Sequence, residues 1–113
     1  MLPTRSLAHA TGVLALAFAL TAAPSFAGEA AASTIVVAKD FMFAPTSLTI
    51  KSGSTVTWTN KDDEPHTVVN DAGLFRSGAM DTNESFSFRF DKPGTYHYAC
   101  SIHPRMVGTI VVQ

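Results

Sequence analysis

Apolar and polar residues alternate along most of the chain after residue 32, and this period of two constrains the fold more than any other feature. Side chains of a β-strand point alternately to opposite faces, so the alternation predicts strands that each bury one face. In one run Val56 and Trp58 share a face while threonines occupy the other. Glycine, proline, asparagine and aspartate separate the runs, as turns require. The strands expected from this pattern cover residues 33–39, 47–51, 54–60, 85–90, 95–100 and 107–112.

No stretch of this region keeps the 3.6-residue period of a long helix. The prediction is therefore an all-β fold, a Greek-key antiparallel β-sandwich, formed by one domain over residues 28–113. Phe86, Phe88 and Phe90 are expected to face its core. Residues 71–84 are the least regular, and we expect a long loop with a short helical turn there.

The N-terminal segment has a different composition. Arg5 precedes an apolar run over residues 12–20, and small residues lead up to Ala27. This order is typical of a secretory signal peptide, here cleaved after Ala27. The alternative is a membrane anchor, but a spanning helix needs about 20 apolar residues and this run is shorter. We expect residues 1–27 to be removed on export, into the periplasm if the host is Gram-negative, with no membrane insertion afterwards.

The charge of the chain is nearly balanced, with 8 lysines and arginines against 9 acidic residues and a formal net charge of −1. Nothing in this balance suggests nucleic-acid binding. Asp62, Asp63 and Glu64 form a short acidic run. Such a run could face a basic partner, but we expect it to be a solvated loop.

The only cysteine, Cys100, cannot form an intramolecular disulfide. His103 and Met106 follow it closely, so a thiolate, an imidazole and a thioether lie within seven residues and form a soft ligand set. His66 begins another β-like run and is the candidate for a second imidazole, whereas His97 alternates to the face opposite Cys100 and is expected at the surface. Two histidines, one cysteine and a weak axial methionine are typical of a blue-copper electron-transfer site.

Other interpretations of these residues are weaker. Zinc sites seldom use a thioether. A catalytic Cys–His pair needs an orienting group and an oxyanion hole, and neither accompanies Cys100 and His103, so we do not expect an enzyme. Met42 and Met80 are expected to be packing or surface residues. A copper carrier or storage protein remains the alternative function, although the chain lacks the methionine- or histidine-rich runs that such proteins usually offer.

From about Ile35 to Val112 the chain resembles the cupredoxins. The two-residue gaps on both sides of His103 are similar to the short ligand loop of amicyanin-like members. The triplet Gly94-Thr95-Tyr96 resembles the tyrosine corner of Greek-key sandwiches. Two positions depart from the amicyanin-like pattern: Thr67 stands where asparagine is common, and Arg105 stands where an aromatic residue is found.

The resemblance implies one type 1 copper ion held by His66, Cys100, His103 and axial Met106. It also implies one-electron shuttling, with transient redox partners such as a dehydrogenase, a cytochrome or an oxidase. The protein is expected to be a monomer.

Overall fold

The protein is described by a computed structural model over residues 1–4, 8, 10–19 and 33–113. Within these ranges no helix is long and apolar enough to cross a membrane. The predicted cleavage point after Ala27 lies outside the described residues, so the division into residues 1–27 and 28–113 stays a prediction. The strands are β1 Ser33–Lys39, β2 Met42–Ala44, β3 Ser47–Ile50, β4 Ser54–Asn60, β5 Val69–Asn70, β6 Ser85–Phe90, β7 Gly94–Ala99 and β8 Val107–Val112.

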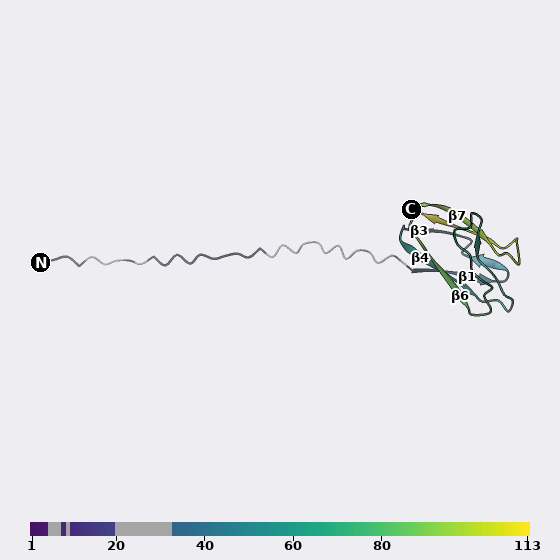
Figure 1. The fold of residues 1–113 in the computed structure, drawn as a ribbon. Helices are drawn as coiled ribbons and strands as arrows, with labels where there is room; N and C mark the ends of the chain where they lie inside the picture. Colours follow the sequence, from purple (N-terminus) through teal and green to yellow (C-terminus); the bar gives the residue numbers. More distant parts are fainter. Residues whose placement is uncertain (5–7, 9, 20–32) are drawn as a thin grey trace.

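The strands form two four-stranded sheets (Figure 1), ordered β2-β1-β4-β6 and β3-β8-β7-β5. This arrangement confirms the all-β sandwich. The sheets are mixed, however, because β1 runs parallel to β4 and β3 runs parallel to β8, while the other pairs are antiparallel. Side chains alternate in the same way in both kinds of pairing, so the sequence pattern carries no signal for strand direction.

The predicted inward faces form an aromatic core. Trp58 is fully buried in β4, and its ring lies 5.6 Å from that of Phe75, 5.8 Å from Phe86 and 5.4 Å from Tyr98. Phe90 of β6 is buried beside them. Truncating a buried aromatic residue to alanine typically costs about 3–5 kcal/mol, so this cluster is a major source of rigidity beneath the loops.

The segment between β5 and β6 differs from expectation. No helical turn is present in residues 71–84, all of which are described. Isolated bridges hold the segment instead, between Val69 and Arg76 and between His66 and Met80. Its apolar side chains Phe75 and Met80 are buried. The prediction of a long loop is confirmed, but in place of a helical turn the loop has two isolated hydrogen-bonded turns, closed from Gly73 N to Asn70 O and from Glu84 N to Asp81 O.

Connections from both sheets meet at one end of the sandwich. They are the two-residue turn between β1 and β2, the segment between β4 and β5, and the loop between β7 and β8. Toward the other end of β7, the hydroxyl of Tyr96 donates to the carbonyl of Lys92 at 2.5 Å. This contact over four residues matches the tyrosine corner expected there.

Candidate metal centre

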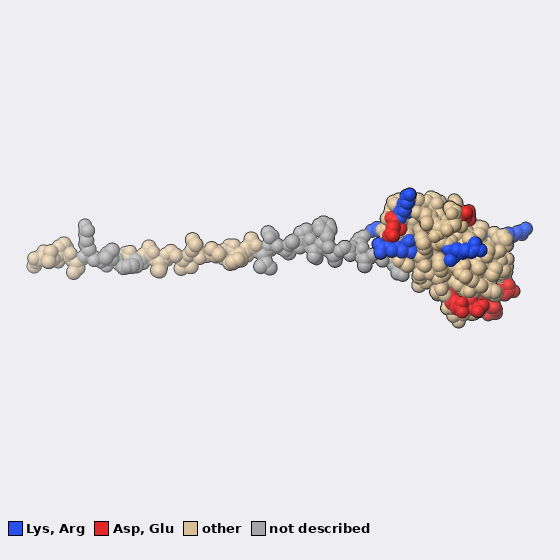
Figure 2. Space-filling view, viewed as in Figure 1, with Lys and Arg blue, Asp and Glu red and all other residues tan. Residues whose placement is uncertain are grey.

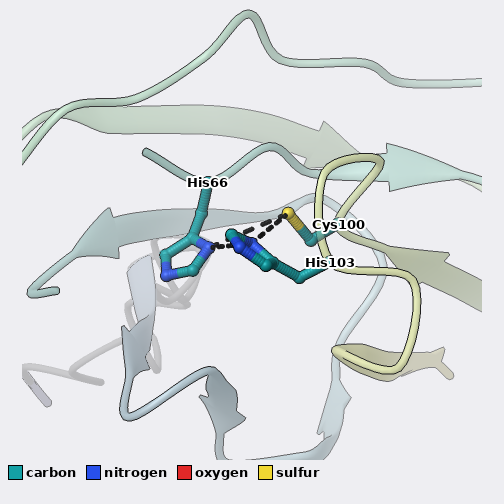
Figure 3. Close-up of side chains that lie close together, drawn as sticks. All are labelled: His66, Cys100 and His103. Carbon is teal, nitrogen blue, oxygen red and sulfur yellow. Dashed lines mark hydrogen bonds between the residues drawn. The ribbon is translucent and has the colours of Figure 1, made fainter. Parts of the chain in front are cut away.

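Three potential ligand atoms converge where the β4–β5 segment meets the β7–β8 loop (Figure 3). His66 Nδ1 lies 3.2 Å from His103 Nδ1, and Cys100 Sγ lies 3.8 Å from each of these nitrogens. His66 is more than 30 residues from the other two, so the fold brings the second imidazole to the loop. The structure thus brings together three of the four residues singled out in the sequence.

His66 is fully buried and is held through both its backbone and its ring. Its N–H donates to the carbonyl of Met80 at 3.1 Å, and the N–H of Met80 donates back at 2.8 Å. Nε2 lies 2.8 Å from Asp62 Oδ2. Because an ionised carboxylate only accepts, Nε2 donates, and a neutral His66 keeps its lone pair on Nδ1. These hydrogen bonds therefore orient the ring with Nδ1 toward the other two potential ligand atoms.

Asp62 is buried, only 6 % exposed, which corrects the prediction that the whole acidic run is solvated. Asp63 and Glu64 are exposed as expected. Burial would raise the pKa of Asp62, but hydrogen bonds from the N–H of Phe41, the ring of His66 and the N–H of Asp40 outweigh it and hold the pKa below its usual value. The residue is thus a buried carboxylate in contact with a predicted ligand.

Thr67 connects His66 to the cysteine loop. Its N–H donates to Cys100 Sγ at 3.3 Å, and its hydroxyl lies 3.7 Å from the same sulfur. The hydroxyl oxygen also accepts the N–H of Ser101 at 2.8 Å. The threonine therefore bonds the cysteine loop from the position where amicyanin-like proteins commonly have asparagine.

The thiol of Cys100 is the only cysteine sulfur of the chain and is 1 % exposed. Burial would raise its pKa, but hydrogen bonds from backbone N–H groups, first that of Thr67 and then those of the loop residues His103 and Ile102, lower the pKa from 9.0 to about 6. The thiolate, which is the form that binds metals, is therefore favoured at neutral pH.

His103 has the more open environment of the two histidines, with 26 % of its side chain exposed. Its ring packs edge-on against Phe41 at a centroid distance of 4.9 Å. Its Nε2 lies 3.5 Å from a carboxylate oxygen of the exposed Glu64. Nδ1 thus points inward to the other ligand atoms while the Nε2 edge faces the surface.

Met106 is buried at the end of the same loop. The loop is closed by two backbone hydrogen bonds of 2.9 Å, from Cys100 N to Met106 O and from Met106 N to His103 O. The role of Met106 as axial ligand stays a prediction. His97 is exposed and bonds Thr109 across the sheet, as expected of a surface residue.

The two other methionines singled out also follow expectation. Met80 packs in the core and Met42 is exposed.

The geometry of the three atoms fits one metal ion. A triangle with sides of 3.2, 3.8 and 3.8 Å has a centre about 2.1 Å from each corner. Zinc, which is similar in size to copper, binds histidine nitrogen at about 2.0–2.1 Å and cysteine sulfur at about 2.3 Å, close to the distances from this centre. A buried thiolate with two imidazoles suits copper as well as zinc, and a nearby thioether favours copper.

A single cysteine–histidine centre at one end of a two-sheet sandwich defines the class of protein. The chain belongs to the cupredoxin-like family, because the model of the cupredoxin-like domain matches residues 11–112.

Similar proteins agree with this. Amicyanin-alpha of Methylorubrum extorquens is 38% identical over 93 residues, which cover 74% of each chain. A solved structure of an amicyanin mutant in its Cu(I) form has a TM-score of 0.69 at 31% identity, and the match covers 72% of this chain and 82% of that one. A copper-containing nitrite reductase from Thermus scotoductus has a TM-score of 0.68 at 30% identity, but the match covers 73% of this chain and only 22% of the enzyme.

Two residues that shape the centre, Asp62 and Phe41, were not predicted from the sequence. Asp62 lies four residues before His66, and this short spacing was the available signal for a contact between them. Its burial could not be predicted, because loop residues lack the regular alternation that indicates burial in strands. The signal for Phe41 was an aromatic residue in a two-residue turn, where glycine or asparagine is usual. Only the folded chain shows that both side chains contact the imidazoles.

Proposed function

We propose that this protein is a type 1 copper protein that carries single electrons between redox partners, with His66, Cys100, His103 and axial Met106 as ligands. The observation that carries the proposal is the convergence of two imidazole nitrogens and one thiol sulfur within 4.8 Å of one another. Membership of the cupredoxin-like family and similarity to amicyanins support copper as the metal.

The bound ion supplies the redox chemistry by alternating between Cu(II) and Cu(I). The chain supplies a set of donors whose positions are fixed in advance. His66 is held by Asp62 and by the backbone of Met80, and Cys100 is held by Thr67. Ligands held by surrounding hydrogen bonds move little when charge changes, which favours fast electron transfer.

The His103 edge is the proposed point of electron exchange, because His103 is the partly exposed member of the three-residue cluster. Exposed apolar side chains lie beside it, at Phe41, Ile102 and Pro104. Such a surface suits a small, weak and transient interface of the kind that redox proteins form.

Electrostatics adds a preference for partner charge. Figure 2 shows acidic side chains gathered at one end of the domain, near the place labelled β6 in Figure 1. Exposed Glu64 contributes negative charge directly beside His103. A dehydrogenase, cytochrome or oxidase with positive charge around its own redox centre would therefore associate faster.

The cellular setting follows from the sequence. Residues 1–27 have the order of a secretory signal, which supports export and, in a Gram-negative host, a periplasmic location. The mature protein is then residues 28–113, acting as a monomer.

An electron carrier is preferred to an enzyme or a copper carrier. The similar nitrite reductase matches over about a fifth of its length, so the likeness concerns one domain and carries no catalytic assignment. A copper carrier exchanges its ion readily, whereas the cysteine and one histidine here are almost fully buried.

The test is to add Cu(II) to the purified, metal-free protein and to the variant Cys100→Ser. The proposal expects an intense visible thiolate-to-copper band at one equivalent in the wild type, reversible one-electron electrochemistry, and no such band in the variant. A colourless complex that passes its copper to a chelating acceptor would favour the carrier instead.

A further inference from the structure

Asp62 makes more contacts than its place in an acidic loop would suggest. Its Oδ2 accepts hydrogen bonds from His66 Nε2 at 2.8 Å and from the N–H of Phe41 at 3.0 Å. Its Oδ1 accepts the N–H of Asp40 at 2.7 Å. One buried carboxylate therefore joins a predicted ligand to the turn between β1 and β2.

We propose that Asp62 is the positioning residue of this metal centre: its carboxylate fixes the His66 ring and the Phe41 turn together, and its charge favours the oxidised ion. The inference rests on the proposed function only in its last part, because the hydrogen bond between His66 Nε2 and Asp62 does not involve the ion.

The turn shows what the carboxylate stabilises. Asp40 and Phe41 have positive φ values of 53° and 57°, a conformation that costs non-glycine residues roughly 1–3 kcal/mol each. Two successive N–H groups in such a turn form a concavity that binds an anion, and here the anion is the side chain of Asp62.

The turn in its left-handed form places the ring of Phe41 over the centre. This ring packs edge-on against both imidazoles, at centroid distances of 5.5 Å to His66 and 4.9 Å to His103. Asp62 thus acts on His66 directly and on His103 through Phe41.

The charge of Asp62 has a separate effect. The carboxylate is one imidazole ring away from the proposed ion and is largely shielded from water. Lys39 lies 3.9 Å away, but its side chain is more than half exposed, so it compensates this charge only in part. Because Cu(II) carries one more positive charge than Cu(I), a buried negative charge stabilises the oxidised form and lowers the reduction potential.

The experiment compares Asp62→Asn with Asp63→Asn. Both variants lose one negative charge at adjacent positions, but Asp63 is exposed. We expect Asp62→Asn to raise the ratio of Cu(I) to Cu(II) affinity at least tenfold, which is a rise in potential of at least 59 mV for one electron. Asp63→Asn should change this ratio less than twofold. Equal shifts in the two variants would overturn the proposed charge effect.

A second measurement needs neither copper nor a stable variant. In the metal-free wild type, ¹⁵N NMR of the histidine rings should show His66 with its proton on Nε2 and a slowly exchanging signal. A ring protonated on Nδ1 alone would refute the positioning role. If the wild type bound no copper, the proposed function would fail while this measurement still decided whether Asp62 orients His66.

Discussion

The two histidines of the candidate metal centre lie in contrasting regions. His66 is fully buried, its backbone pairs with Met80, and its outer nitrogen bonds a buried carboxylate. His103 belongs to a short loop, is about one quarter exposed, and its outer nitrogen faces an exposed glutamate. The inner nitrogens of the two rings are nevertheless only 3.2 Å apart. Histidine thus has two roles here: the ring of His66 is held fixed inside the protein, and the ring of His103 reaches the surface.

This contrast shows why the centre is divided between two parts of the chain. A histidine within a short exposed loop can approach the surface, but such a loop offers few groups to hold its ring. The segment around His66 supplies the missing constraint, because Asp62 and Thr67 bond the His66 ring and the Cys100 sulfur.

The largest effect should come from removing each imidazole in turn. His66→Gly and His103→Gly should both lose the thiolate-to-copper band. Added imidazole should restore the band in His103→Gly, whose gap opens to solvent, and not in His66→Gly, whose gap is enclosed. Visible titration with copper, with circular dichroism as a control for folding, measures this. If imidazole restored the band in both variants, the difference in solvent access between the two histidine sites would be contradicted.

The pH dependence of the free energy of unfolding should reveal the lowered pKa of Cys100, which lies between the two histidines. The pKa of Cys100 is lowered in the folded chain, so its thiolate stabilises the fold above the unfolded pKa, and this contribution is lost as the pH falls toward the folded pKa. Between pH 6 and pH 9 the free energy of unfolding of the metal-free protein should rise by about 3 kcal/mol. Denaturant titrations across this range measure the slope, and Cys100→Ser should lack this component. An identical slope in the variant would show that the thiol is not the cause.

The strands that flank the His103 loop can be disturbed without touching a ligand. Gly108 in β8 lies opposite Tyr98 in β7, and a Cβ at Gly108 would lie 2.2 Å from the buried tyrosine ring. Gly108→Ala should therefore lower the free energy of unfolding by about 3 kcal/mol or more. Chemical denaturation measures this. In a double-mutant cycle with Tyr98→Ala most of the loss should disappear, and strict additivity would show that the clash is relieved elsewhere.

The smallest effect is expected at the hydroxyl of Tyr98. This oxygen is buried and forms no hydrogen bond of ordinary geometry among the described residues; the nearby N–H of Trp58 opposes the rise that burial causes in the pKa of Tyr98, but it is too poorly placed to count as a full partner. A buried polar group without a partner is unfavourable, so Tyr98→Phe should raise the free energy of unfolding by about 1 kcal/mol. Thermal and denaturant unfolding measure this. A clear loss of stability would mean that the hydroxyl is bonded in solution.

The sequence predicted the parts of the molecule that depend on local chemistry. Alternation placed Val56, Trp58 and the phenylalanines of β6 on inward faces, and donor type singled out His66, Cys100 and His103. Local patterns could not show strand direction, which depends on pairing between distant segments.

Local patterns also failed for Asp62. A charged residue in a loop is normally solvated, and its burial depends on partners more than 20 residues away in the β1–β2 turn. The contacts of Asp62 with the distant β1–β2 turn explain its burial, and they cannot be recognised from the sequence around it.

The difference in burial between His66 and His103 should also affect how copper enters and leaves the site. Cys100 and His66 are almost fully buried, so the partly exposed ring of His103 is the part of the cluster that a chelator or a copper donor reaches first. A redox protein docked on that edge would cover this ring for as long as it stays. Loss of copper should therefore slow down in the docked complex, and the protein would retain its ion best while it is in use.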